Sequence, residues 1–164
     1  MKKVAFIFPG QGSQTIGMGK DFFENSDIAK EMILSASTRL GIDFENLLFE
    51  ENENLGKTEF TQPAILLVSS IALAIFKDKC DITPEFVLGH SLGEFSALVA
   101  SGALDYLDAI ELVHKRGLFM TAACSGGGAG MMALVGIDDA TVEKVCEQQR
   151  EVGKKVWPAN YNMD

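Results

Sequence analysis

One serine, set between two glycines, constrains the fold of this chain more than any other feature. The segment Gly89–Gly93 has the sequence GHSLG, follows a short apolar run and precedes a helical pattern over residues 92–101. A turn of this kind between a strand and a helix is so sharp that glycine is needed two residues on either side of the serine, and it leaves the hydroxyl exposed at the end of the sheet. The pattern predicts that Ser91 is a nucleophile; the alternative is an ordinary serine in a surface loop.

A nucleophilic serine needs a base, and neither histidine of the chain fits that role. A serine hydroxyl is a weak nucleophile at neutral pH until another group, most often histidine, takes its proton. His90 adjoins Ser91 and points to a different side of a tight turn, while His114 lies two residues before Arg116 and therefore on another helix face. We expect that the base is absent from these 164 residues.

The order of the expected elements is that of an α/β protein. Residues 3–8 form a short apolar run typical of a buried strand, and residues 85–89 are expected to form a second short strand. The expected helices span residues 26–41, capped by Ser26 and ended by Gly41, about 61–77, with Pro63 in the first turn, 92–101, and a longer stretch from Asp105, whose side chain can cap it. Strands alternating with helices predict a parallel sheet.

The glycine run Gly126–Gly128 is the clearest joint in the chain, because consecutive glycines are costly inside a regular element. After it the sequence predicts a strand over residues 130–137, a helix over 138–150 capped by Asp138 or Asp139, and a strand over 154–162. We therefore divide the chain into residues 1–125, the amino-terminal part of a large α/β domain, and residues 126–164, the start of a small subdomain.

Composition argues against several classes of protein. The net charge of −9 argues against a nucleic-acid partner, which would need clustered Lys and Arg. The three cysteines are far apart and form no CxxC pair, so neither a zinc site nor a disulfide framework is expected. The longest apolar stretch, residues 64–76, contains two serines and is shorter than the ~20 residues that span a bilayer, and the amino terminus lacks a signal-peptide pattern. We expect an unexported, cytoplasmic protein without a bound metal and without a membrane segment.

The glycine-rich segment PGQGSQTIGMG, residues 9–19, has the look of a phosphate-binding loop but fails both tests for one. A dinucleotide-binding fingerprint would need glycine at position 15, where this chain has Thr15. A P-loop would need lysine at position 18, where it has Met18. The segment leaves the carboxyl end of a predicted strand, where open α/β sheets bind ligands. Gln11 is suited to hold a hydrogen-bond donor beside Ser91; the alternative is a plain strand-to-helix turn.

Arg116 is the third candidate residue. Leu112, Arg116 and Met120 are four residues apart, so a guanidinium lies on the same helix stripe as two apolar side chains. Such a charge either extends to water or meets a carboxylate, which arginine binds through two parallel hydrogen bonds. Spacing alone favours extension to water or an internal ion pair over a ligand.

Six segments together resemble one enzyme family. FPGQGSQ, TQPA, GHSLGE, HKRGLFM, MMALVG and ANYN occur in order along the whole chain and look like the malonyl-CoA:acyl carrier protein transacylases of fatty-acid synthesis. The resemblance implies an α/β-hydrolase-like parallel-sheet domain with an inserted ferredoxin-like subdomain, inside which this chain ends. The family's basic histidine lies in the part of the large domain that follows the insert. ANYN is usually followed by Ser-Pro-Gly in the family, whereas here Met163 and Asp164 follow.

The resemblance also implies roles for particular residues. Ser91 would accept the malonyl group from coenzyme A as an ester, and the phosphopantetheine thiol of acyl carrier protein would remove it. The N–H groups of Leu92 and Gln11 would form the oxyanion hole. Arg116 would bind the malonyl carboxylate, Met120 would line the same pocket, and a leucine at position 92 goes with malonyl rather than branched acyl groups. The partners implied are malonyl-CoA, acyl carrier protein and the missing carboxyl-terminal half, with no cofactor.

Two other functions remain as alternatives. A serine esterase or thioesterase would share the turn around Ser91, but it would not need Arg116 and would normally carry an HGGG-type oxyanion loop, which is missing. A chain without its base would instead be an inactive structural or binding fragment.

Overall fold

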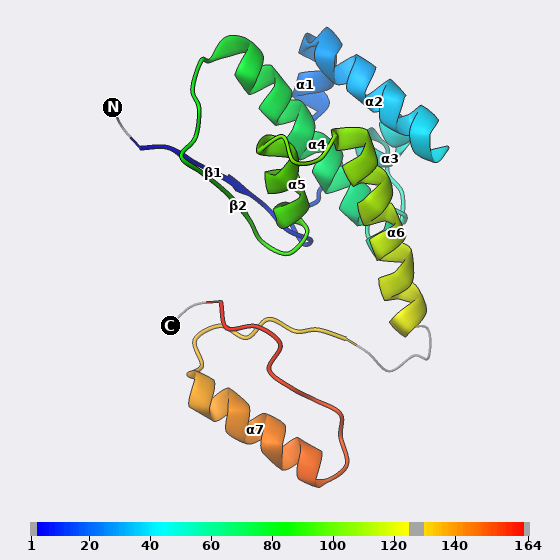
Figure 1. The fold of residues 1–164 in the computed structure, drawn as a ribbon. Helices are drawn as coiled ribbons and strands as arrows, with labels where there is room; N and C mark the ends of the chain where they lie inside the picture. The colour runs from blue at the N-terminus through cyan, green and yellow to red at the C-terminus, as the bar shows by residue number, and fades with distance from the viewer. Residues whose placement is uncertain (1–2, 125–129, 163–164) are drawn as a thin grey trace. The chain divides into compact units, whose positions relative to one another are not determined.

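The computed structural model describes residues 3–124 and 130–162, and the chain divides into two compact units, Met1–Gly127 and Gly128–Asp164. The elements of the first unit are β1 (Ala5–Phe8), α1 (Lys20–Asn25), α2 (Asp27–Leu40), α3 (Phe44–Phe49), α4 (Thr58–Lys79), β2 (Phe86–Gly89), α5 (Gly93–Ala100) and α6 (Tyr106–Cys124), and the second unit has α7 (Asp139–Glu151). Figure 1 shows these elements in chain order.

The two strands form a parallel pair, as the sequence predicts. Ala5 lies opposite Phe86 and Phe8 lies opposite Gly89, and the strands run side by side in Figure 1. Because the strands are parallel, their carboxyl ends meet at one edge of the sheet. The loop that contains Gln11 and the turn that contains Ser91 therefore both begin at that edge.

The prediction that residues 3–8 form a buried strand is wrong for one face of the sheet. The face that carries the Phe6 side chain is covered: the strands pack on α5, and the Phe6 ring contacts the Phe76 ring of α4 at 5.3 Å between centroids. Ile7, Phe86 and Leu88 alternate onto the opposite face, where Ile7 is 73% exposed. A parallel sheet is buried on both faces only when a layer of helices covers each of them. Among the described residues, α5 and α4 cover one face of the sheet, and no helix covers the face that carries Ile7.

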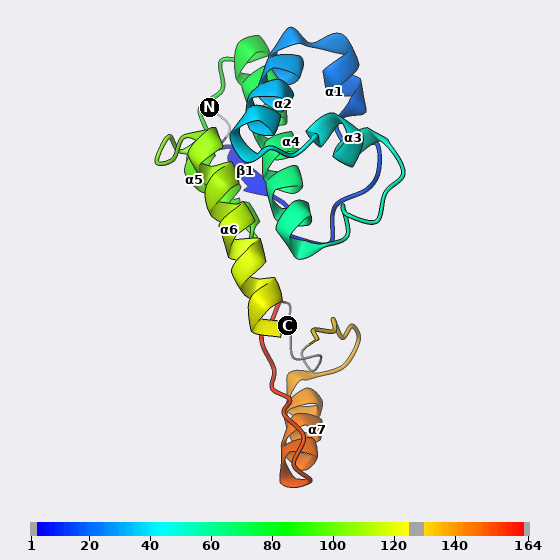
Figure 2. The same ribbon diagram turned by 90° about the vertical axis from the view of Figure 1, so that its right-hand side faces the viewer.

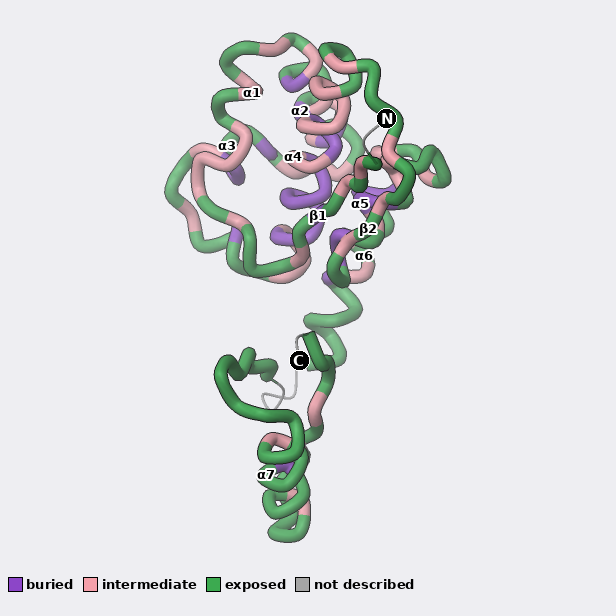
Figure 3. The backbone as a smooth tube through the Cα atoms, turned by 90° about the vertical axis from the view of Figure 1, so that its left-hand side faces the viewer, coloured by how far each residue is buried: buried purple, intermediate pink, exposed green. Residues whose placement is uncertain are grey.

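The core of the first unit is built around α4. This helix contacts α2, α3, α5 and α6, and Figure 3 shows buried backbone concentrated along it. By length and composition α4 could cross a membrane, with a mean hydropathy of 1.6, but 56% of its apolar window is buried inside the unit. Its apolar residues are those of a core helix.

Helix α4 starts earlier than the sequence indicates. The expected start near Thr61 is wrong by three residues, since the helix begins at Thr58. Pro63 consequently lies in the second turn of the helix, where a proline leaves one backbone carbonyl without its usual intrahelical partner.

Three of the four expected helix-end contacts are present. Gly41 ends α2 at φ 66°, Asp105 accepts a hydrogen bond from the Leu107 N–H at 2.8 Å, and Asp138 accepts one from the Thr141 N–H at 2.9 Å. Ser26 occupies the position before α2, but its side chain makes no capping hydrogen bond there.

The second unit contains the expected helix, α7, without the expected strands. Residues 130–137 and 154–162 form no strand in the part of this unit that the structure describes. A strand needs a neighbour to take its backbone hydrogen bonds, and the apolar pattern of these segments does not supply one. Met131 and Val135 are 81% and 89% exposed. The predicted glycine joint and the 125/126 boundary lie outside the described residues, as do Met163 and Asp164.

Candidate active site

Ser91 sits on a strained turn between β2 and α5. Its φ is +52°, and it is the one non-glycine residue with a positive φ in the described ranges 3–124 and 130–162. Residues with a side chain rarely adopt a positive φ because the Cβ atom then clashes with the backbone. Such a conformation persists only where the surrounding structure imposes it. Ser91 itself is exposed. The local geometry is that of a strand-to-helix turn that presents a hydroxyl at the carboxyl edge of a sheet.

The two flanking glycines explain how the turn is possible. A Cβ atom on Gly89 would lie 1.9 Å from the carbonyl carbon of Gly93, and one on Gly93 would lie 2.3 Å from the carbonyl oxygen of Phe8. Real Cβ atoms do not approach backbone so closely. Glycine at both positions therefore lets β2 turn directly into α5 against the end of β1.

Two backbone donors lie in the loops at this edge. Leu92 is fully buried and immediately precedes α5, while the first loop approaches the turn closely enough that a Cβ on Gly10 would lie 2.6 Å from the His90 carbonyl oxygen. In the described part of the chain, neither the Leu92 N–H nor the Gln11 N–H has a hydrogen-bond partner. Such free donors beside a nucleophile can stabilise a developing oxyanion.

Arg116 reaches Ser91 from α6. Its Nη2 atom donates to Ser91 Oγ at 3.2 Å, its Nη1 atom donates to Gln62 Oε1 at 2.6 Å, and its guanidinium carbon lies 5.7 Å from the centre of the Phe95 ring. No carboxylate forms a salt bridge with it among residues 3–124 and 130–162. Of the two outcomes that helix spacing favours, extension to water or an internal ion pair, the ion pair is therefore wrong for this part of the chain. A half-buried positive charge stands beside Ser91 without a neutralising partner among the described residues.

Gln62, a residue that the sequence analysis did not single out, joins the candidate residues to one another. Its Nε2 atom donates to Met120 Sδ at 3.2 Å and, at a longer 3.5 Å, to Gln11 Oε1. Because the Arg116 guanidinium can only donate, the Gln62 oxygen must face it and the amide nitrogen must face the other two. Gln11 in turn donates to Thr58 Oγ1 at 3.1 Å. The only signal in the sequence was a glutamine directly before an apolar run; its complete burial, which calls for hydrogen-bond partners, is visible only in the structure.

The structure thus brings Ser91, Arg116, Gln11 and Met120 into one connected set. Neither histidine belongs to it: no hydrogen bond from His90 or His114 to Ser91 exists among the described residues, and His114 Nδ1 instead lies 2.8 Å from the Glu59 carbonyl oxygen.

Glu59 is the acidic residue nearest to this set along α4, and its carboxylate is bonded to Thr121 of α6 and not to Arg116. Its own backbone N–H lowers the pKa of its side chain, burial opposes this, and a hydrogen bond from Thr121 at 2.9 Å lowers the pKa further. The carboxylate is therefore ionised at neutral pH and bonded to Thr121.

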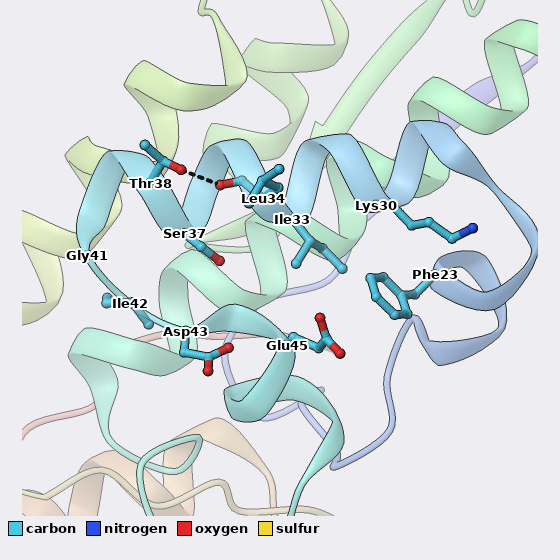
Figure 4. Close-up of a pocket in the computed structure, with 10 residues that line it drawn as sticks. All are labelled: Phe23, Lys30, Ile33, Leu34, Ser37, Thr38, Gly41, Ile42, Asp43 and Glu45. Atoms are coloured by element: carbon cyan, nitrogen blue, oxygen red, sulfur yellow. Dashed lines mark hydrogen bonds between the residues drawn. The ribbon is translucent and has the colours of Figure 1, made fainter.

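A hollow elsewhere in the first unit is not this site. It has a volume of about 400 Å³, lies between α2 and α3, and is lined by Phe23, Lys30, Ile33, Leu34, Ser37, Thr38, Gly41, Ile42, Asp43 and Glu45 (Figure 4). Two of its charged groups already have partners: Asp43 caps α3 and Lys30 pairs with Asp27 at 3.1 Å. It holds none of the candidate residues.

Comparison with known proteins assigns the class. A family model described as "Acyl transferase domain" matches residues 5–162, and the chain belongs to that family. Among curated relatives, the malonyl CoA-acyl carrier protein transacylases of Staphylococcus aureus (strain COL) and Bacillus subtilis (strain 168) are 44% and 45% identical over 163 residues, which is 99% of this chain. The resemblance to malonyl transacylases is therefore confirmed.

Solved structures agree with the sequence comparison. The malonyl-CoA:acyl carrier protein transacylase of Helicobacter pylori is 46% identical with a TM-score of 0.85, over 89% of this chain and 48% of that one. A malonyl-transacylase in complex with a type II PKS acyl carrier protein is 33% identical with a TM-score of 0.82, over 92% of this chain and 49% of that one. The chain spans about half the length of the relatives it matches, 52% and 51% for the two curated transacylases.

Proposed function

We propose that the complete protein transfers a malonyl group from coenzyme A to acyl carrier protein in fatty-acid synthesis. One observation carries the proposal: the guanidinium of Arg116, which has no carboxylate partner in the described part of the chain, lies 3.2 Å from Ser91 Oγ. An acyl group attached to Ser91 would lie against this cation, and a malonyl group ends in a carboxylate that arginine binds with two hydrogen bonds. Relatives that match 99% of the chain bear the corresponding name.

The first half of the reaction forms an ester on Ser91. The hydroxyl oxygen attacks the thioester carbonyl of malonyl-CoA, its proton passes to a base, and the carbonyl oxygen becomes an oxyanion held by the N–H groups of Leu92 and Gln11. The C–S bond then breaks, and coenzyme A leaves as the thiol after taking the proton back. Loss of a single oxyanion donor typically costs on the order of a hundred- to a thousand-fold in rate.

The second half returns Ser91 to its free state. The thiol of the phosphopantetheine arm attacks the ester carbonyl, the base takes the thiol proton, and the serine oxygen leaves with that proton. No cofactor takes part, because phosphopantetheine belongs to the partner. One structural neighbour was solved as a malonyl-transacylase bound to an acyl carrier protein, which supports this partner. Met120, bonded to Gln62, is proposed to line the acyl pocket beside Arg116.

The base and the rest of the fold are assigned to the part of the relatives that this chain does not span. We propose that a histidine there activates Ser91, that further chain covers the exposed face of the sheet around Ile7, and that residues 126–164 begin a ferredoxin-like subdomain. We also propose that the complete protein works in the cytoplasm. The comparisons give no support to an esterase or to a purely structural role.

The direct test separates transfer from hydrolysis. The complete protein is incubated with malonyl-CoA and acyl carrier protein, either with or without the phosphopantetheine arm, and malonyl-carrier protein and free malonate are both measured. The proposal predicts malonyl-carrier protein as the main product, and only with the arm present. Free malonate as the main product in both mixtures would show a thioesterase instead.

A further inference from the structure

Pro63 leaves the backbone carbonyl of Glu59 without its intrahelical hydrogen bond, and the side chain of His114 on α6 bonds to that carbonyl instead. In a regular helix the N–H of residue 63 would bond to the Glu59 carbonyl, but proline has no N–H. His114 Nδ1 lies 2.8 Å from that carbonyl oxygen. Because a carbonyl oxygen only accepts hydrogen bonds, Nδ1 must carry the proton. A hydrogen bond between helices has replaced one within a helix.

Two other contacts tie α6 to the same residue of α4. A Cβ on Gly117 would lie 2.6 Å from Glu59 Cα, so the two backbones touch as closely as a glycine permits. Thr121 Oγ1 donates to Glu59 Oε2 at 2.9 Å. His114, Gly117 and Thr121 are three and four residues apart and share one face of α6. We call these three residues with Glu59 the Glu59 clamp.

The clamp lies next to Arg116, which contacts Ser91, and to Gln62, which contacts Arg116. Gln62 is three residues after Glu59 on α4, and Arg116 lies between His114 and Gly117 on α6. The bond of 2.6 Å from Arg116 Nη1 to Gln62 Oε1 joins the two helices at this level. A slide of one helix past the other by a single residue rise, about 1.5 Å, would lengthen and misalign this bond.

We propose that His114 is a positioning residue for the reaction: by bonding the carbonyl that Pro63 leaves free, it fixes α6 against α4 so that Gln62 holds Arg116 toward Ser91. His114 does not touch the acyl group; it acts through Gln62 and Arg116. The inference rests on the proposed function, because it takes Arg116 as the group that binds the malonyl carboxylate. A purely stabilising histidine would satisfy the Glu59 carbonyl without affecting which acyl group is transferred.

Substitutions at positions 114 and 63 separate these two roles in the complete protein. His114→Ala removes the interhelical bond. His114→Asn keeps a donor near the position of Nδ1. Pro63→Ala restores the intrahelical N–H, so that His114→Ala combined with Pro63→Ala satisfies the Glu59 carbonyl while the tie between the helices stays lost. The readouts are the kcat and KM for malonyl-CoA and acetyl-CoA and the midpoint of thermal unfolding.

A positioning role gives a specific pattern. His114→Ala lowers the ratio of malonyl to acetyl kcat/KM by roughly tenfold or more, since small displacements of a binding group are costly. His114→Asn recovers most of the ratio. The double variant recovers thermal stability without recovering the ratio, and Pro63→Ala alone keeps both close to those of the parent protein.

Two results would overturn the proposal. One is an unchanged malonyl-to-acetyl ratio in His114→Ala, and the other is a ratio that returns in the double variant together with stability. Arg116→Ala is measured in parallel: if it lowers the ratio while His114→Ala does not, only the positioning role fails. If Arg116→Ala leaves the ratio unchanged, the assigned carboxylate site fails and the positioning role fails with it.

Discussion

The Nη2 atom of Arg116 lies 3.2 Å from the hydroxyl oxygen of Ser91, and among the described residues no carboxylate neutralises that guanidinium. Two residues 25 positions apart in the chain, one on a strained turn and one on a long helix, thus place a hydroxyl group and a cation in contact. Figure 2 shows α6, which carries Arg116, running past α5 and extending beyond the amino-terminal end of α4.

Replacement of Arg116 by alanine is expected to remove the preference for malonyl over acetyl groups. Truncating one partner of a hydrogen-bonded charge pair typically costs about 2–5 kcal/mol, or roughly thirtyfold and upward in kcat/KM. Acetyl transfer, which has no carboxylate to lose, should change much less. Lys115→Ala is the matched control, because Lys115 is the adjacent cation and bonds to Glu111 on the outside of the helix. Equal losses for both acyl groups in Arg116→Ala would contradict the assigned role.

Alanine at Gly89 is expected to prevent the turn around Ser91 from forming. The new methyl group would overlap the backbone of Gly93, which cannot move away without breaking the start of α5. We expect a loss of about 3 kcal/mol or more in the free energy of unfolding, together with loss of activity. Gly56→Ala is the control, because its nearest atom would lie at an ordinary 3.8 Å, and it should change stability by less than about 0.5 kcal/mol. Similar denaturation midpoints for the two variants would show that the turn tolerates a side chain.

Part of the acid sensitivity of the first unit is expected to come from Glu111. A hydrogen bond from Lys115 and one from Arg39 of α2 hold the pKa of Glu111 below its ordinary value of 4.5. A carboxyl group whose pKa is lowered by folding stabilises the folded state above its unfolded pKa, and this contribution is lost as the pH falls through the folded pKa.

Glu111→Gln should therefore lose less thermal stability than the parent protein between about pH 6 and about pH 3. The measurement is the unfolding midpoint as a function of pH, and Glu31→Gln, an exposed position on α2, serves as the control for net charge. Parallel curves for the parent and Glu111→Gln would show that the bonds to Lys115 and Arg39 add nothing.

The parts of the fold that local patterns specify were predicted well, and those that depend on distant contacts were not. The parallel pairing of residues 5–8 with 86–89 follows from short apolar runs that alternate with helices. Gly41 ends α2 for a local reason, its left-handed φ. Exposure of Ile7 and the absence of strands among residues 130–162 depend on which chain packs against those segments, and no pattern within a segment contains that information.

The same distinction holds for the candidate site. Ser91 could be predicted because the glycines that permit its turn lie two residues away on each side. Gln62 was missed because its partners Gln11, Arg116 and Met120 lie 51, 54 and 58 residues away. Pro63 pointed to a helix start because proline favours the first turn, yet it is accommodated inside α4 with His114 bonded to the carbonyl that it leaves free.

The proposed reaction requires that Ser91 carries the acyl group, and the intact mass of the complete protein after brief incubation with malonyl-CoA measures this. We predict an added mass of one malonyl group, localised by peptide mapping to the segment that contains Ser91 and absent from Ser91→Ala. A malonyl adduct that persists in Ser91→Ala, or no adduct on a folded parent protein that transfers malonyl groups, would contradict the account.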